Sequence, residues 1–280
     1  MEIKKAIIPV AGWGTRRLPI TKVIEKSMLP IGNRPIVDYV VEDCARAGIK
    51  EVYIVIDEKP FSQVKAYYEQ NATLNKYLIA RDKGDKLSIV ETKPSGMTIH
   101  FFVQKDVDTR YGTAAPVAQV VEAYNINEPI AVLMGDDFIW SSDGSSDLKR
   151  LIDLVQTPED SALLAVQIPP DQVEKYGVLK IENDILTGIY EKPKKEDAPS
   201  NFINISKYIM SVELLKLIVD YYNANHFGPR DQEYLITDPI ITHIKNQGKI
   251  HVLPITGQYL DGGTLEGWLH ANNVVCSTQE

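Results

Sequence analysis

The sequence has few of the features that mark secreted, zinc-stabilised or membrane proteins. Its 280 residues include only two cysteines, Cys44 and Cys276, and neither belongs to a CxxC pair. We therefore expect neither a structural zinc site nor a disulfide framework. Because no stretch of about 18 apolar residues is present and residues 1–5 lack the apolar core of a signal peptide, we expect no membrane span and a cytoplasmic location.

Positive charge is also scarce overall. Lysine and arginine number 30 against 38 aspartate and glutamate residues, which gives a net charge of −8. Proteins that coat a nucleic-acid backbone usually carry a basic excess, so we expect no nucleic-acid partner. A small anionic substrate stays open, because basic residues gather near the N-terminus at Arg16, Arg17, Lys22 and Lys26.

Strand and helix patterns alternate in the first half of the chain. Short apolar runs predict buried strands over 6–10 and 130–134, and the patterns predict further strands over 51–56 and 98–104. Apolar residues at helical spacing predict helices over 35–48 and 113–124. Repeated βα units predict an α/β fold with a mainly parallel central sheet and helices on both faces.

The second half is less regular. Its patterns predict strands over 161–168 and 250–255, a hairpin that joins 177–181 to 187–190, and helices over 212–222 and 239–246. No linker, internal repeat or low-complexity segment interrupts the chain. We therefore expect a single domain over 1–280 with a smaller, more antiparallel part in its second half.

Two glycines, Gly12 and Gly14, follow the first predicted strand. Glycine lets the backbone approach a phosphate closely and adopt a positive φ, and α/β proteins bind ligands beyond the carboxyl ends of their strands. The loop also fits a plain tight turn, and two glycines alone do not decide between these interpretations. It is not a dinucleotide fingerprint, because Arg17 stands where the third glycine would be, and no Walker A Gly-Lys-Ser/Thr follows.

Arg16 and Lys26 favour the phosphate interpretation of this loop. Cations stabilise the negative charge that grows on a departing pyrophosphate, so they would act mainly in the transition state. Each alone also fits a solvated surface charge.

The glycine loop is the first of several blocks that together resemble one family. The blocks are Gly12-x-Gly14-Thr15-Arg16-x-Leu18-Pro19, Thr21-Lys22, Lys26-x-Met28-Leu29-Pro30, Pro35-Ile36-x-x-Tyr39-Val40-Val41, Gln104, Gly112, Gly135-Asp136-Asp137, Tyr176-Gly177-Val178, Glu191-Lys192-Pro193, Thr237-Asp238 and Asp261-Gly262-Gly263. In this order they resemble the sugar-phosphate nucleotidyltransferases, and most closely the bacterial UTP–glucose-1-phosphate uridylyltransferases (UDP-glucose pyrophosphorylases). Because the blocks span nearly the whole chain, their combined match is far more specific than any single motif.

The resemblance implies a Rossmann-like nucleotidyltransferase fold, with a nucleotide-binding half over 1–140 and a sugar-binding and C-terminal half over 141–280. The residues implied to bind the nucleotide are Ala11, Gly12, Gly14, Thr15, Arg16, Lys26, Gln104, Gly112 and Asp136. Those implied to bind the sugar phosphate are Gly177, Glu191 and Lys192, and those implied to bind Mg²⁺ are Asp136 and Asp261. The residues implied to be catalytic are Arg16, Lys26, Asp136 and Lys192.

The residues themselves support part of this assignment. Asp136 follows a buried strand, which would place its carboxylate at the ligand edge of the sheet, and Mg²⁺ prefers a few carboxylates with phosphate oxygens and water. Asp137 fits better a strand-ending turn with an N-cap function. Asp261 also fits a turn before two glycines, and Glu191 with Lys192 also fits the surface end of a strand.

The implied reaction transfers a uridylyl group from UTP to α-D-glucose 1-phosphate and yields UDP-glucose and pyrophosphate. Gln104 would read the edge of the uracil, and Gly112 would pack against the base. The resemblance also implies a homodimer or homotetramer, for which residues 227–234 offer a contact.

The sequence departs from the usual family pattern beside several of these blocks. Glu25 and Ser27 stand where proline and glutamate are usual, and Leu235 stands where glutamine is usual. Residues 110–114 replace Gly-Leu-Gly-His-Ala, and 204–208 replace an apolar stretch that ends in Gly-Arg-Tyr. The same chemistry with dTTP or CTP, or with another hexose 1-phosphate, therefore stays open, as does a non-catalytic sugar-nucleotide sensor.

Overall fold

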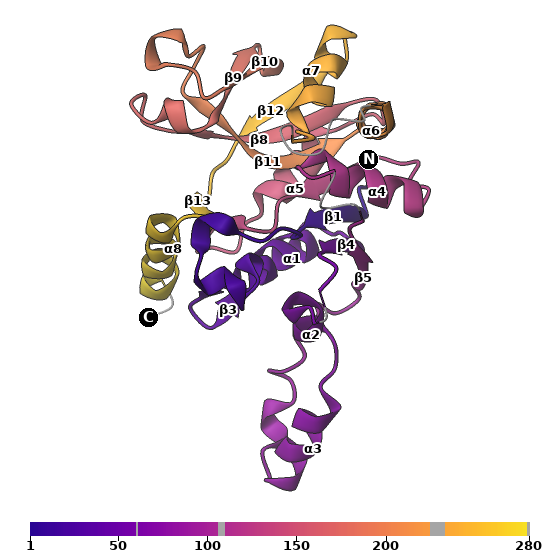
Figure 1. Ribbon diagram of the computed structural model, residues 1–280, viewed down its shortest axis with the longest axis vertical. Coiled ribbons are helices and arrows are strands. Elements are labelled where there is room, and N and C mark those ends of the chain that lie inside the picture. The colour runs from indigo at the N-terminus through magenta and orange to yellow at the C-terminus, as the bar shows by residue number, and fades with distance from the viewer. Residues whose placement is uncertain (60, 106–109, 225–232, 279–280) are drawn as a thin grey trace.

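One mixed sheet runs through both halves of the chain in the computed structural model, which describes residues 1–59, 61–105, 110–224 and 233–278 (Figure 1). Within these residues the sheet has nine strands. In their order across the sheet they are β5 (Thr98–Val103), β4 (Glu51–Ile56), β1 (Lys5–Pro9), β6 (Ile130–Leu133), β11 (Phe202–Met210), β8 (Ser161–Gln167), β12 (Ile250–Pro254), β10 (Ile185–Glu191) and β9 (Gly177–Glu182).

The strand directions differ between the two halves of the sheet. β5, β4, β1 and β6 are parallel, as the apolar runs predict, and so are β8 and β12. β9 and β10 form the predicted antiparallel hairpin at one edge. The sequence patterns do not predict β11, which lies antiparallel between β6 and β8. Its register shifts between Asn204 and Tyr208, where Ser206 has φ +54°, so the alternation of apolar residues is interrupted.

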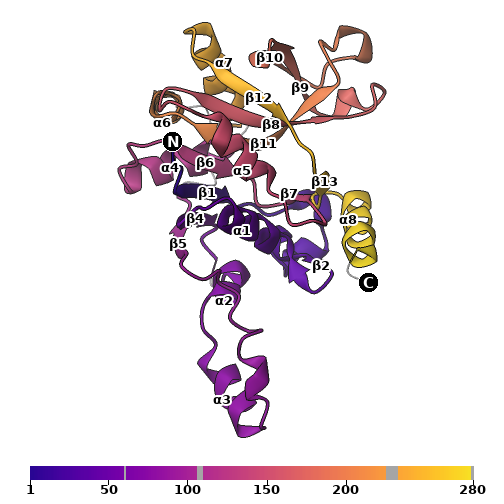
Figure 2. The same cartoon turned by 180° about the vertical axis from the view of Figure 1, so that it is seen from behind.

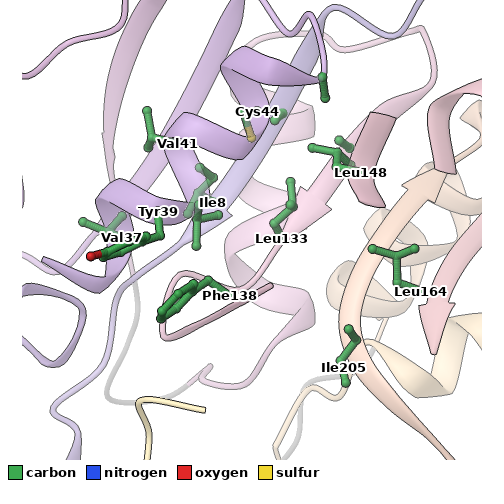
Figure 3. Packing of buried hydrophobic residues seen from close by; sticks show 14 of the residues in the cluster. Ile8, Val37, Tyr39, Val41, Cys44, Leu133, Phe138, Leu148, Leu164 and Ile205 are labelled. Carbon is green, nitrogen blue, oxygen red and sulfur yellow. The ribbon is translucent and has the colours of Figure 1, made fainter. Parts of the chain in front are cut away.

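Helices cover both faces of the sheet, as expected. α1 (Ile36–Arg46) and α5 (Asp147–Leu154) lie on one face, and α4 (Ala114–Ala123), α6 (Val212–Ala224) and α7 (Thr237–Lys245) lie on the other. Alternate strand residues therefore enter different cores. Ile8 and Leu133 pack with Val41 and Cys44 of α1 (Figure 3), whereas Ile7 packs in the cluster beneath α4.

Two small antiparallel sheets, three further α-helices and six short 3-10 helices complete the described elements. β7 (Asp137–Trp140) pairs with β13 (Gln258–Asp261), and β2 (Pro30–Ile31) pairs with β3 (Arg34–Pro35). α8 (Leu265–Ser277) packs beside β13 and β2. α2 (Gln63–Tyr68) and α3 (Ala72–Ala80) lie on a segment that projects from the sheet in both views (Figures 1 and 2).

Three expectations concern features beyond the sheet. Neither Cys44 nor Cys276 forms a disulfide in the described structure. Among the described helices, none combines the length and apolar character that a membrane crossing needs. The predicted subunit contact at 227–234 lies outside the described residues, except for Glu233 and Tyr234.

Candidate active site

A cavity of about 360 Å³ opens at the carboxyl ends of β1, β5 and β6. Its volume is in the range of small-molecule binding sites. Every residue that the sequence predicts to bind nucleotide lines it: Ala11, Gly12, Gly14, Thr15, Arg16, Lys26, Gln104, Gly112 and Asp136. Segments separated by more than 100 residues in the sequence therefore meet at one edge of the sheet, where α/β proteins bind their ligands.

The glycine loop needs its glycines for conformational reasons. Gly12 has φ +130° and Gly14 has φ +59°, which residues with a Cβ rarely adopt. Thr21 Oγ1 donates a hydrogen bond of 2.9 Å to the Gly14 carbonyl, and Gly12 N donates one of 2.8 Å to Asp57 Oδ2. Sequence reasoning missed Asp57, although a carboxylate that directly follows a strand is a recognisable signal.

Two of the four basic residues that gather near the N-terminus reach the cavity. Arg16 and Lys26 line the cavity, but Arg17 and Lys22 are not among the described residues that do so. The short 3-10 helix η1 (Thr15–Arg17) directs the Arg17 side chain to Trp268 of α8, where its guanidinium lies 5.4 Å from the ring centroid and is buried. The cavity therefore receives two cations from this segment.

Lys26 and Asp136 form an ion pair inside the cavity. Lys26 begins the 3-10 helix η3 (Lys26–Met28), and Asp136 lies between β6 and β7. Burial raises the pKa of the Asp136 carboxyl, but the charge and hydrogen bond of Lys26, together with the charge of Lys207, lower it below its usual value. Asp136 is therefore an anionic oxygen donor at neutral pH.

Asp137 does not cap a turn, and our prediction for it is wrong. It begins β7, its carboxylate pairs with the buried Lys207 ammonium, and Oδ2 accepts a hydrogen bond of 2.9 Å from Tyr259 Oη. Lys207, which is 70 residues away in the sequence, draws this side chain inward, and the local sequence does not reveal such a partner. Sequence reasoning also missed Lys207 as a neighbour of the cavity, although it noticed that 204–208 is unusual.

Asp261 comes from the C-terminal half and lies beside the Lys26–Asp136 pair. It ends β13, where it pairs with Asp137 across the ladder, and the next residue, Gly262, donates a hydrogen bond of 3.2 Å to the Asp136 carbonyl. A Cβ on Gly263 would be 2.8 Å from Asp261 Oδ1 and 3.1 Å from Lys26 Nζ, so these two groups are neighbours. Oδ1 also accepts a hydrogen bond from Gly263 N at 2.6 Å, so Asp261 stabilises the turn as well.

The carboxylates of Asp136 and Asp261 are the candidate ligands for a metal ion. Among the described residues, no group of three or more histidine, cysteine, aspartate or glutamate side chains gathers as a self-sufficient metal site. Two neighbouring carboxylates fit an ion such as Mg²⁺, which takes its remaining ligands from substrate phosphates and water.

The three predicted sugar-phosphate residues lie together but are not among those that line the cavity. A Cβ on Gly177 would be 3.2 Å from Glu191 Oε2, and Lys192 N donates a hydrogen bond of 3.0 Å to the Tyr176 carbonyl. Burial and, secondly, the Asp261 carboxylate raise the pKa of Tyr176. The start of β9 and the end of β10 therefore lie together, and Tyr176 next to them is near enough to Asp261 to feel its charge.

Two further residues that sequence reasoning missed, Tyr111 and Glu233, also line the cavity. They belong to segments that pair through backbone hydrogen bonds of 2.8 Å, from Tyr234 N to the Tyr111 carbonyl and from Ala114 N to the Tyr234 carbonyl. The departure of 110–114 from the family pattern was the available signal for them.

Comparisons with known proteins agree with this geometry. A family model described as nucleotidyl transferase matches residues 5–278. The UTP–glucose-1-phosphate uridylyltransferase of Mycoplasma genitalium is 30% identical over 97% of this chain and 91% of its own. A UTP-bound UGPase from Acinetobacter baumannii has a TM-score of 0.86 at 25% identity over 98% of this chain and 93% of its own. A UDP-glucose pyrophosphorylase complexed with UDP-glucose has a TM-score of 0.79 at 30% identity, over 99% of both chains.

The chain belongs to the nucleotidyl transferase family. Its similarity to UTP–glucose-1-phosphate uridylyltransferases extends over nearly the whole chain, so the resemblance predicted from the motifs is confirmed.

Proposed function

We propose that this protein transfers a uridylyl group from UTP to α-D-glucose 1-phosphate, and that UDP-glucose and pyrophosphate are its products. The observation that carries the proposal is the single cavity lined by all nine predicted nucleotide-binding residues, with Asp261 beside Lys26 and Asp136. The names of the relatives, a uridylyltransferase and a protein solved with UDP-glucose, support the choice of substrates.

The nucleotide would lie along the glycine loop. Gly12 and Gly14 let the backbone approach the triphosphate, and Arg16 and Lys26 would neutralise its charge. Gln104, which is buried at the end of β5, would hydrogen-bond the uracil edge, and Gly112 would pack against the base.

Asp136 and Asp261 would hold Mg²⁺, which supplies positive charge to the phosphate oxygens when it is bound. Lys26 pairs with Asp136 in this structure, and with UTP present its ammonium would bind phosphate oxygens instead. The ion pair thus keeps the two groups in reach of each other before the nucleotide arrives.

The acceptor would enter from the β9–β10 hairpin. Glu191 would accept hydrogen bonds from glucose hydroxyls, Gly177 would give the sugar room, and Lys192 would bind the 1-phosphate. An oxygen of that phosphate attacks the α-phosphorus of UTP in line, a new P–O bond forms, and the bond to pyrophosphate breaks. Because the attacking oxygen is already anionic, catalysis consists of positioning and charge stabilisation, with no protein nucleophile.

Pyrophosphate release from UTP and glucose 1-phosphate tests the proposal. We expect Asp136→Asn and Lys26→Ala each to lower kcat/KM by about 100-fold or more. Asp136→Asn weakens the proposed Mg²⁺ site, and Lys26→Ala removes a cation, so each variant loses positive charge that would stabilise the phosphates in the transition state. Asp143→Asn and Lys4→Ala, which change exposed residues in the same way, should keep full activity. Near-normal turnover in both folded cavity variants would refute the assignment.

A second candidate keeps the chemistry but uses dTTP, CTP or another hexose 1-phosphate. Tyr111 and Glu233 favour testing it, because both line the cavity beside a segment that departs from the family pattern. A panel of nucleotides against sugar phosphates distinguishes the two. A non-catalytic sensor would bind UDP-glucose tightly in the same panel and form no pyrophosphate with any pair.

A further inference from the structure

A buried polar cluster lies directly behind Asp136 and is formed by Asp137, Lys207 and Tyr259. Lys207 comes from β11 and only 2% of its surface is exposed. Its ammonium pairs with Asp137 Oδ1, and Tyr259 Oη of β13 donates a hydrogen bond of 2.9 Å to Asp137 Oδ2. One carboxylate therefore connects the three strands β7, β11 and β13.

Lys207 clamps the turn that presents Asp136. Its Nζ donates a hydrogen bond of 2.9 Å to the Met134 carbonyl and also binds Asp137, so it contacts the chain on both sides of Gly135 and Asp136. Gly135 packs against the end of β1, where an added Cβ would be only 2.4 Å from Val10 Cγ1. The turn is thus held between β1 and the Lys207 ammonium and has little freedom to move.

The same cluster determines where Asp261 lies. Tyr259 and Asp261 are both on β13, whose ladder pairs Asp261 with Asp137. Gly262 N adds a hydrogen bond of 3.2 Å to the Asp136 carbonyl. Asp137 therefore links Lys207 on one side to the strand that carries Asp261 on the other. In this network it lies between Asp136, which lines the cavity, and Asp261, which is not among the lining residues.

We propose that Lys207 and Tyr259, acting through Asp137, are positioning residues for the pair of carboxylates Asp136 and Asp261. The inference rests on the proposed function, in which that pair holds a divalent cation. Neither residue needs to contact substrate. Lys207 balances the buried charge of Asp137, so that Asp137 adds no unpaired negative charge beside Asp136.

Divalent-cation binding in variants of the whole protein tests this inference. Lys207→Met keeps the length of the side chain and removes its charge, Lys207→Arg keeps the charge, and Tyr259→Phe removes one hydrogen bond. We expect Lys207→Met to raise the Mg²⁺ concentration for half-maximal activity by about tenfold or more, and Tyr259→Phe to raise it by a smaller factor. Lys207→Arg should need a Mg²⁺ concentration close to that of the wild type, because it keeps the positive charge. Lys245→Met, at an exposed lysine on α7, is the matched control.

The readout independent of turnover is Mn²⁺ binding in the presence of UTP, followed by electron paramagnetic resonance. Dissociation constants that rise in the same order of variants support the inference, and wild-type Mn²⁺ binding in folded Tyr259→Phe and Lys207→Met overturns it. If Lys207→Met does not fold, Tyr259→Phe and Lys207→Arg decide. Should the wild type form no UDP-glucose, the proposed function fails while the Mn²⁺ titration still tests the positioning.

Discussion

Gly112 is the residue at which the cavity has least room for change. Its φ is +115°, and a Cβ there would be 2.6 Å from the backbone nitrogen of Tyr234. Because backbone cannot rotate aside as a side chain can, any larger residue must displace the segment that pairs with 111–114.

We expect Gly112→Ala to weaken UTP binding about tenfold and to cost roughly 1–3 kcal/mol of stability. Gly144→Ala is the matched control, because Gly144 has φ +75° but open space around its Cβ position. Gly144→Ala therefore has the conformational cost of a positive φ without a steric clash like the one between a Cβ at position 112 and the Tyr234 backbone. Urea unfolding and equilibrium UTP binding measure both effects, and equal losses in the two variants would contradict the steric explanation.

His243 gives the protein a pH-dependent stability of predictable sign. Its ring is fully buried in α7, and neither ring nitrogen has a hydrogen-bond partner in the described structure. Burial lowers the pKa of His243 below 6.5. The unfolded chain therefore binds a proton at a higher pH than the folded chain does, so stability is complete above about pH 6.5 and decreases as the pH falls below it.

We expect the unfolding free energy of the wild type to decrease more steeply between pH 7.5 and pH 5.5 than that of His243→Leu. The steepest slope that one proton allows is about 1.4 kcal/mol per pH unit. His270→Leu changes an exposed histidine and should keep the wild-type slope. Urea titrations at both pH values measure the unfolding free energy of each protein. Parallel curves for the wild type and His243→Leu would show that His243 is not the source.

At the scale of elements, α2 is joined to the segment that carries Lys26. Glu25 Oε1 accepts a hydrogen bond of 3.0 Å from Gln63 N and Oε2 accepts one of 3.3 Å from Val64 N, so its carboxylate caps the first turn of α2. Gln63 Oε1 in turn accepts a hydrogen bond of 2.8 Å from Glu25 N. A proline, the usual family residue at this position, has no N–H to donate.

We expect Glu25→Ala to cost about 1–2 kcal/mol of stability and to raise the KM for UTP, because the segment beside Lys26 loses the two hydrogen bonds that its carboxylate accepts from α2. Glu25→Gln keeps an acceptor oxygen and should lose less. Glu69→Ala removes an exposed carboxylate at the other end of α2 and serves as the control. A KM for UTP unchanged in Glu25→Ala would show that the link is only structural.

The elements also show what local sequence can predict. β1, β4 and β6 are largely buried runs of apolar residues, whereas β5 at the edge of the sheet is partly exposed, and the ends of all four are predicted to within about one residue. β7 and β13 have four residues each, which is too short for a periodic pattern. β11 contains Asn204, Ser206 and Lys207, whose polar side chains make sense only once Asp137 and the bulge are known.

At the scale of the whole molecule, the cavity depends on contacts between residues far apart in the sequence, which no local pattern predicts. Motifs predicted nine of the residues that line it, because each block carries its own signal. Asp57 meets Gly12 across 45 residues, and Lys207 meets Asp137 across 70, so both were visible only after folding. The sheet brings both halves of the chain to this one edge, so a ligand bound there should stabilise the folded chain as a unit.

Ligand-linked stability therefore tests the site on the intact protein without measuring turnover. A ligand that binds only the folded state at 100 times its dissociation constant adds about 2.7 kcal/mol, which for a chain of this size corresponds to a rise in Tm of roughly 5 °C. We expect this rise with UTP and Mg²⁺ together. We expect a much smaller one with UTP and a chelator, because Asp136 and Asp261 then repel the triphosphate. Asp136→Asn should lose most of the Mg²⁺-dependent part, while Asp143→Asn should keep it. An equal rise with and without the metal would mean that the two carboxylates take no part in nucleotide binding, whatever else the cavity holds.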